Sequence, residues 1–416
     1  MRLKLLTSIV LIGFAGAAAA QEAKPAFEFA LHGFVSGTLY VQDGATYASP
    51  GQQVLSASGQ YGTDKLIFGG DVRQSRFNFS VKGPQVMGGA TPKAVLEVDF
   101  FGMNQLALGA GGTPAYGAFG EQSVIPRIRF AYAELAYENT TFWFGQQNHL
   151  TFAAAPMSLT HIAFPLGYET GNIGWRSPGI FGFHRFGDAD LKHEFAWEIG
   201  AANWNFAGAA TSGLTNYITA GSASGLPIVQ LRYTATMGKA FNAWLAGSWN
   251  RLDLNGPDAV KTSCDTGTAC STKDAVAGAV GAKLSMMGLT LQGAGWYGKN
   301  TGGLLGNLVQ FTPATYVGDL FGWGAWGQVG FNLTNEFSAW YMIGASALVD
   351  WAYAEANALA RLRNVDNVLL VQYRDGGFAM GFEWAHFYTI NRVAGPPVGD
   401  TSAHANQWAL TTNYYF

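Results

Sequence analysis

The chain has 416 residues, of which 49% are hydrophobic, 14% aromatic and only 12% charged, and its formal net charge at pH 7 is −3. Soluble globular chains have about 25% charged residues, and nucleic-acid-binding domains are usually strongly basic, so this composition argues against both classes. Beyond the N-terminal segment no apolar run is long enough for a transmembrane helix.

The N-terminus has the three parts of a secretory signal peptide. A basic start with Arg2 and Lys4 precedes a short apolar run and an A-x-A cleavage site that ends at Ala20. We therefore predict a signal peptide over residues 1–20 and export from the cytoplasm. Residues 21–416 are interpreted as a single domain.

Segments with the alternation of apolar and polar residues that is typical of β-strands follow in chain order. These sixteen segments are 27–41, 66–83, 93–103, 126–138, 141–150, 177–186, 191–203, 226–237, 240–253, 275–287, 289–298, 321–333, 336–349, 366–374, 377–391 and 405–416. Long and short connections alternate between them, which indicates an up-and-down antiparallel meander. In a transmembrane barrel the long loops are extracellular and the short turns periplasmic.

The alternation also predicts which face of a strand meets lipid. In segment 66–83, Phe77 and Phe79 alternate with polar residues such as Arg76. Lipid cannot satisfy polar groups, so the polar face is assigned to the lumen. Segment 336–349 is apolar on both faces, and we expect it to pack against a folded loop or a neighbouring subunit.

The fourth segment carries two arginines on its expected lumen face. Ile128, Phe130 and Tyr132 form an apolar set, which we predict to face lipid. Arg127 and Arg129 would then point inward.

Acidic residues lie on the neighbouring segment. Glu97 and Asp99 are in the third segment and Arg76 is in the second, so all three are expected beside Arg127 and Arg129. A ring of charges biases which ions and solutes enter a pore. The alternative is a ladder of cross-strand ion pairs that stiffens the wall.

A barrel of this strand number is too wide for side chains to fill, so it encloses an aqueous channel. The connection 151–176 is the candidate for narrowing it, because it mixes apolar anchors with His161, Glu169 and Arg176. The alternative is a surface loop without such a role. The predicted pore-lining or constriction residues are Arg76, Glu97, Asp99, Arg127, Arg129, His161, Glu169, Arg176 and Arg232.

The last segment ends the chain inside a strand. Trp408, Leu410, Tyr414 and Phe416 alternate with mostly small or polar residues. Such an edge must be paired, and pairing with the first segment closes a barrel. The alternative is an edge strand of a secreted sandwich. We predict an all-β fold, namely a 16-stranded antiparallel transmembrane β-barrel with long extracellular loops and short periplasmic turns.

Two cysteines lie in one Gly/Thr/Ser/Asp-rich connection. Because the chain is exported and no histidine lies near them, we predict a Cys264–Cys270 disulfide rather than a metal site. No metal or cofactor is predicted. The chain has seven histidines and no G-x-S-x-G motif, so no residue is predicted to be catalytic.

Four fragments resemble the DcaP-like group of trimeric Gram-negative porins. They are Ser75-Arg76-Phe77, Glu97 to Gly102, Arg127 to Leu135 and Gly145-Gln146. The C-terminal Phe416 is likewise similar to the ending of bacterial outer-membrane barrels. The resemblance implies a sixteen-stranded homotrimer in the outer membrane with a folded-in third loop. It also implies passive uptake of small solutes, with anionic dicarboxylates as the expected class.

The sequence therefore predicts an outer-membrane porin for passive diffusion of small hydrophilic solutes. Its expected partners are these solutes, membrane lipid and lipopolysaccharide, and further copies of the chain, but not nucleic acid. The alternative function is a structural or adhesive outer-membrane barrel with an occluded lumen.

Overall fold

The structure is a computed structural model that describes residues 27–44, 46, 66–102, 125–202, 219–254, 272–310, 318–349, 360–393 and 399–416. The predicted signal peptide over residues 1–20 and the predicted Cys264–Cys270 disulfide lie outside these residues. Among the described residues, no helix is both long and apolar enough to span a membrane.

One antiparallel sheet contains all the strands. They are β1 (Glu28–Gln42), β2 (Ile67–Asp71), β3 (Arg76–Lys82), β4 (Thr91–Asp99), β5 (Arg127–Ala136), β6 (Thr140–Asn148), β7 (Arg176–Gly187), β8 (Leu191–Gly200), β9 (Ile228–Met237), β10 (Phe241–Asp253), β11 (Thr272–Met286), β12 (Leu289–Lys299), β13 (Phe321–Asn332), β14 (Phe337–Leu348), β15 (Arg361–Asp375), β16 (Phe378–Val393) and β17 (Gly399–Tyr415). β1 pairs with β17 on one side and with both β2 and β3 on the other. Because β2 and β3 are two parts of one strand, the sheet is the closed 16-stranded barrel that the sequence predicted.

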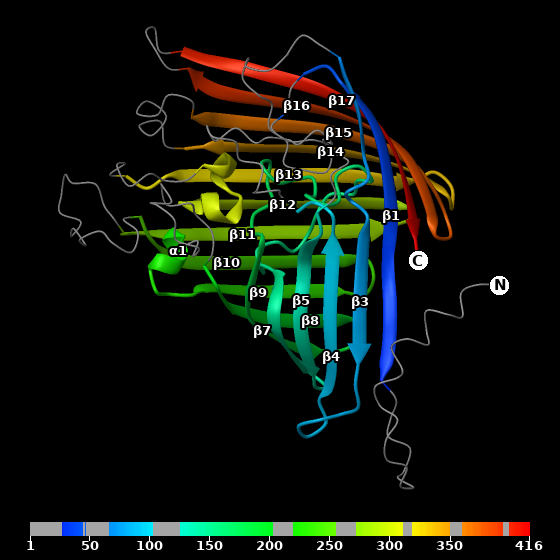
Figure 1. Cartoon of the computed structure of the whole chain (residues 1–416), viewed down its shortest axis with the longest axis vertical. Helices are drawn as coiled ribbons and strands as arrows, with labels where there is room; N and C mark the ends of the chain where they lie inside the picture. The colour runs from blue at the N-terminus through cyan, green and yellow to red at the C-terminus, as the bar shows by residue number, and fades with distance from the viewer. Residues whose placement is uncertain are drawn as a thin grey trace.

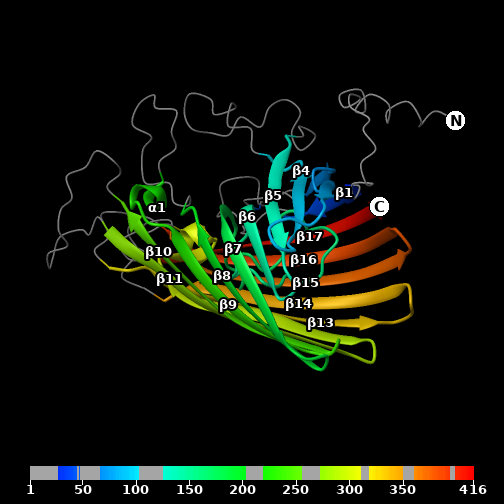
Figure 2. The ribbon, with the colours of Figure 1, turned by 90° about the horizontal axis from the view of Figure 1, so that it is seen from below.

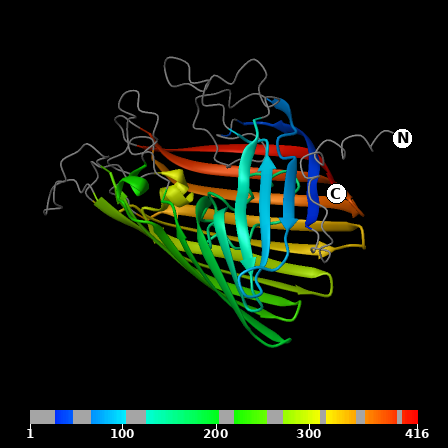
Figure 3. The same cartoon turned by 60° about the horizontal axis from the view of Figure 1, so that its bottom comes forward.

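The two ends of the barrel differ. Figure 1 shows the later strands side by side in one wall, with β1 and β3 to β5 crossing in front of them, and Figure 2 shows the same wall from below. Tight hairpins such as that between β15 and β16 lie at one end (Figure 3). Helix α1 (Ala220–Ala223) and the 3-10 helices η3 (Thr301–Leu304) and η4 (Asn307–Val309) lie at the other.

The predicted strand 66–83 is interrupted between β2 and β3. The Asp71 carboxylate accepts hydrogen bonds from the backbone N–H of Arg73 at 2.7 Å and from its guanidinium at 2.8 Å. Ser75 Oγ donates to the backbone at 2.8 Å. Such local side-chain bonds compete with the strand ladder, and the strand therefore bends at this point.

The last strand alternates between an exposed outer face and a buried inner face. Leu410 is 47% exposed, whereas the adjacent Thr411 is 0% exposed. This is the pattern expected for lipid outside and polar surroundings inside. The terminal Phe416 exchanges two backbone hydrogen bonds of 3.1 Å with Gly33, so the barrel closes to the last residue.

A β-bulge in β5 reverses which side of the sheet the residues beyond it face. The register against β4 shifts by one residue after Glu97, so that Arg129 is the extra residue. Beyond the bulge, Phe130 lies opposite the buried Glu97. Tyr132 stacks on Trp143 at a ring-centroid distance of 4.8 Å, and Trp143 packs against a buried cluster inside the barrel. The prediction that Phe130 and Tyr132 face lipid was therefore wrong.

β14 is apolar on both faces because its inner face packs against a segment folded into the barrel. Ile343 is exposed on the outer surface. On the inner face, Met342 packs with Leu166 and Trp340 packs with Leu159. The first of the two expectations for this strand, packing against a folded loop, agrees with the structure.

Candidate functional site

Residues 149–175, here called the inner loop, connect β6 to β7 through the inside of the barrel. Many of its side chains are buried, including Thr160, His161 and Thr170. Its backbone is bound by side chains that point inward from several strands. The predicted inward fold of segment 151–176 agrees with this arrangement, and its role in limiting permeation remains a prediction.

Gln74, at the bend between β2 and β3, holds the middle of the inner loop. Its Nε2 donates to the Thr160 carbonyl, and its Oε1 accepts from the backbone N–H of Ile162 at 2.8 Å. The Gln74 side chain is fully buried. Leaving such a buried amide without its partners is costly, so this contact fixes the loop against the wall.

An ion-pair network on β4 and β5 lies next to this contact. Arg129 binds Glu97 through Nε at 2.8 Å and Asp99 through Nη1 at 2.9 Å. Arg127 binds Asp99 through Nε at 2.9 Å. Nη1 of Arg129 also donates to the Ala163 carbonyl at 3.0 Å. The network therefore joins the two strands to each other and to the inner loop.

Arg76 of β3 completes this cluster. Its Nε lies 3.6 Å from a Glu97 oxygen, and its Nη2 donates to the Ile162 carbonyl at 3.1 Å. The side chains of Arg76 and Arg127 are each 17% exposed. Those of Asp99 and Glu97 are 0% and 10% exposed. Arg76 and Arg127 are therefore more exposed than the two carboxylates, whereas Arg129, at 5%, is less exposed than Glu97.

Arg176 begins β7 beside the same cluster. Its guanidinium lies 3.9 Å from the ring centroid of Trp175, and it is close enough to Arg127 and Arg129 to be repelled by them. Arg127 in turn lies 4.7 Å from the ring centroid of Phe164. Cation–π contacts of this kind offset part of the repulsion between the arginines.

Glu383 of β16 binds the inner loop on another side of the barrel. One of its oxygens accepts from Ser158 Oγ at 2.7 Å, and the other lies 2.7 Å from His161 Nδ1. All three side chains are buried. His161 therefore serves as an anchor of the loop, one residue before Ile162, whose carbonyl Arg76 binds.

Two further glutamines bind the inner loop from β9 and β13. Gln328 accepts from the backbone N–H of Met157 at 2.7 Å and donates to its carbonyl at 2.9 Å. Gln230 accepts from the backbone N–H of Thr151 at 3.0 Å. The loop is thus held by amide side chains around much of the wall.

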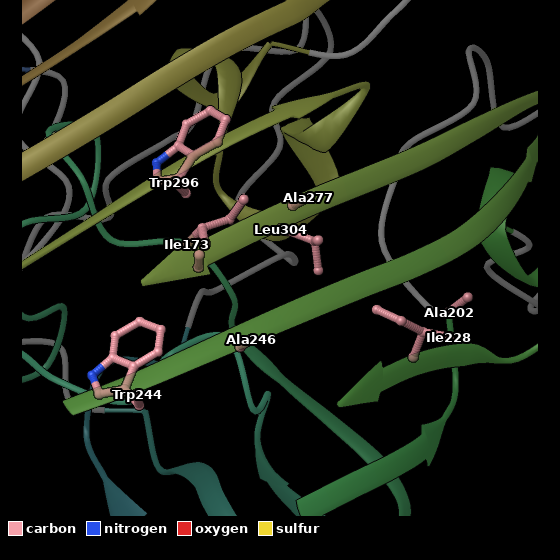
Figure 4. Close-up of a cluster of buried hydrophobic side chains, with 9 residues drawn as sticks. Ile173, Ala202, Ile228, Trp244, Ala246, Ala277, Trp296 and Leu304 are labelled. Carbon is pink, nitrogen blue, oxygen red and sulfur yellow. The ribbon is translucent and has the colours of Figure 1, made fainter. Parts of the chain in front are cut away.

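Apolar packing fixes the second half of the inner loop. Ile173 lies in a buried cluster with Trp244 of β10 and Trp296 of β12 (Figure 4). The adjacent Asn172 accepts a hydrogen bond from Trp326 Nε1 at 2.6 Å. Both contacts draw this part of the loop against strands β10 to β13.

The structure brings together some of the predicted site residues and separates others. Those that meet in the arginine cluster are Arg76, Glu97, Asp99, Arg127, Arg129 and Arg176. Glu169 is buried at a turn of the inner loop, and burial raises its pKa to about 8. Arg232 of β9 binds Glu194 of β8 at 3.1 Å. His161, Glu169 and Arg232 therefore occupy three other places.

Sequence reasoning missed the glutamines that hold the loop. Gln74, Gln230 and Gln328 are uncharged, and the prediction considered charged groups as candidates for the lumen. The signal that could have found them is a long amide side chain at an inward position of a strand, where it needs a partner.

Replacing Gly171 by alanine should loosen the inner loop. Gly171 has φ +145°, and an added Cβ would lie 2.5 Å from the Ala325 carbonyl carbon. The expected cost is about 1–3 kcal/mol of stability, measured as a lower midpoint of heat unfolding in detergent. Gly225→Ala is the matched control, because Gly225 also has positive φ but has open space around it. Equal midpoints for the two variants would show that the close approach is unimportant.

Comparisons with solved structures identify the fold. The outer-membrane channel DcaP of Acinetobacter baumannii matches 96% of this chain and 100% of its own, with 16% identity and a TM-score of 0.66. An anion-selective porin from Comamonas acidovorans matches 94% and 100%, with 12% identity and a TM-score of 0.55. OmpT of Vibrio cholerae in its trimer form matches 94% and 100%, with 10% identity and a TM-score of 0.54.

The barrel therefore has the 16-strand fold of trimeric Gram-negative outer-membrane porins, as the resemblance to DcaP-like porins implied. No protein-family profile and no curated protein matches the sequence.

Proposed function

We propose that this protein is an outer-membrane porin that forms a water-filled channel for passive diffusion of small hydrophilic solutes. Support comes from the closed barrel with an apolar outer face, and from fold neighbours described as an outer-membrane channel and a porin. The predicted signal peptide over residues 1–20 supports the same location. In this proposal lipid and lipopolysaccharide surround the barrel, and its role is not enzymatic.

We also propose that the solutes are preferentially anionic, with dicarboxylates as the candidate class. The observation that carries this proposal is that Arg76 and Arg127 are more exposed than Asp99 and Glu97. The cluster contains four arginines, including Arg176, but only these two acids, so it has an excess of positive charge. Guanidinium groups bind carboxylates through two parallel hydrogen bonds, so an organic acid finds suitable donors there.

A homotrimer is the proposed assembly. The resemblance to DcaP-like porins implies three copies, and the Vibrio cholerae neighbour is described in a trimer form. The exposed apolar residues on the outer surface, such as Leu39 and Leu410, suit both lipid and a neighbouring copy.

Conductance in a planar lipid bilayer tests the function directly. The purified protein should give stepwise ion currents, because a water-filled lumen conducts. In a salt gradient the reversal potential should have the sign of anion preference, because the cluster has excess positive charge. Currents with the sign of cation preference would contradict the proposed selectivity, and a bilayer without current would contradict the channel.

A barrel with an occluded lumen is the second candidate function. It is favoured by one observation, which is that the inner loop is bound on several sides, by Gln74, Gln328 and Glu383. In that case the wild-type protein would give no current, while a variant without the Glu383 anchor would conduct. The same bilayer measurement therefore separates the two candidates.

A further inference from the structure

Residues 300–310, here called the strap, follow β12 and lie against the second half of the inner loop. The Gly174 N–H donates to the Leu304 carbonyl at 2.7 Å, and Leu305 belongs to a buried cluster with Tyr168. Figure 3 shows η3 and η4, which lie within the strap, at the end of the barrel opposite the tight hairpins. The strap therefore supports the inner loop at that end of the barrel.

The backbone of the strap is strained. φ is +52° at Asn307, +55° at Leu308 and +54° at Val309, so three consecutive residues without a glycine are left-handed. In L-amino acids this conformation brings Cβ too close to the following carbonyl oxygen, and a β-branched residue such as Val309 is an outlier there. Strain of this kind persists only where the surroundings impose it, and it is typical of switch regions.

Arg361, the first residue of β15, holds the strained turn. Its Nε donates to the Leu308 carbonyl at 2.8 Å, and its Nη2 donates to the Val309 carbonyl at 3.1 Å. The Arg361 backbone exchanges two further hydrogen bonds, of 2.8 and 2.7 Å, with the Gln310 side chain. The register of β15 against β16 shifts between Arg361 and Arg363. The strap is therefore attached to the wall at the irregular end of a strand.

Two buried atoms of the strap add to the cost of this arrangement. Asn307 Oδ1 and Thr301 Oγ1 have no hydrogen-bond partner among the described residues, although Asn307 Nδ2 donates to the Leu320 carbonyl at 2.8 Å. Buried polar atoms without partners are costly. The hydrogen bonds of Arg361 and the burial of Leu308, which is 0% exposed, act in the opposite direction. In the strap, local strain is thus offset by contacts with the wall.

We propose that the strap is a gate with two states and that Arg361 is its latch, an inference that rests on the proposed channel function. In the first state Arg361 binds the strained carbonyls and Leu308 is buried. In the second state the latch is released, residues 307–309 return to negative φ, and Leu308 leaves the interior. Relief of strain offsets part of the lost contacts, so the second state is populated. The inner loop then loses its contacts with Leu304 and Leu305, and conductance rises.

Val309→Gly tests the strain without a measurement of current. Glycine adopts positive φ without a steric clash, and Val309 is only half-buried, so little packing is lost. The midpoint of heat unfolding in detergent should rise by about 2 °C. Val86→Gly is the matched control, because Val86 lies between β3 and β4, is 39% exposed and does not have positive φ. There the added freedom of the unfolded chain should lower the midpoint.

Arg361→Gln removes the latch. The Leu308 and Val309 carbonyls lose their charged donor, so transitions to a more conducting level in a planar bilayer should become about tenfold more frequent. Adding Val309→Gly to this variant should lower the frequency again, because the first state is then no longer strained. Arg363→Gln is the control, since Arg363 is exposed on the same strand, and it should keep the wild-type frequency.

Two results would overturn the gate. One is a midpoint that Val309→Gly lowers as much as Val86→Gly does, and the other is a wild-type frequency of transitions in Arg361→Gln. A bilayer without current in every variant would contradict the channel and the gate together, whereas the unfolding midpoints report the strain separately. Should Arg361→Gln fail to fold, Arg361→Lys keeps the charge without the planar fork that reaches two carbonyls, and its frequency should exceed that of the wild type.

Discussion

Replacing Arg127 and Arg129 together by glutamine should shift the reversal potential in a salt gradient toward cation preference. The two arginines supply half of the positive charge of the arginine cluster, and they form ion pairs with Asp99 and Glu97. Without them the two carboxylates face the lumen beside only Arg76 and Arg176. Removing one side of a buried ion pair costs roughly 3–5 kcal/mol, so the midpoint of heat unfolding should also fall.

A variant in which the two acids are also neutralised distinguishes the effect of the cluster's charge on selectivity from the effect of lost stability. Adding Glu97→Gln and Asp99→Asn to the double variant removes the uncovered acids and restores the excess of positive charge. It should therefore recover much of the anion preference. Arg232→Gln is the control away from the inner loop, because Arg232 binds Glu194, and its shift should be smaller. If the double variant keeps the wild-type potential, the arginines act only as part of the wall.

Replacing Glu383 by alanine should increase single-channel conductance and current noise. Glu383 binds both Ser158 and His161 of the inner loop at 2.7 Å, and its loss frees this part of the loop from β16. Leaving buried polar groups without a charged partner costs on the order of 3 kcal/mol, so heat unfolding should begin at a lower temperature. Conductance traces and unfolding midpoints of the same preparation measure both effects.

Glu383→Gln is the matched comparison for this variant. The amide keeps the shape of the side chain and one acceptor oxygen, so the conductance of Glu383→Gln should lie between that of the wild type and that of Glu383→Ala. A fall in stability with unchanged conductance in both variants would show that the other anchors, such as Gln74 and Gln328, hold the loop without Glu383.

Much of the barrel could be predicted because its pattern is local. In the last strand, Leu410 and Thr411 are adjacent, yet one is exposed outside and the other is buried inside. At the bulge at Arg129 the local alternation no longer predicts which face a residue occupies. A single extra residue reverses the faces beyond it, and the apolar set that included Tyr132 matched the lipid-facing pattern although the structure turns Tyr132 inward.

Part of the candidate site could be predicted because its residues lie on strands that follow one another in the chain. Arg127, Arg129, Glu97 and Asp99 lie on adjacent strands, and their pairing follows from the hairpin order of the chain. The partners of the inner loop do not follow from that order. His161 is 222 positions from Glu383, and Met157 is 171 positions from Gln328. Nothing in a local pattern joins residues so far apart.

The sequence by itself determined the strand number, the closure of the barrel and the face of most strands, because each residue of a membrane barrel wall is matched separately to lipid or to water. Only the tertiary structure decided where the inner loop lies and which side chains hold it. The physical reason is that these contacts depend on filling the interior of a closed barrel, where a buried polar group must find whichever partner the far wall presents.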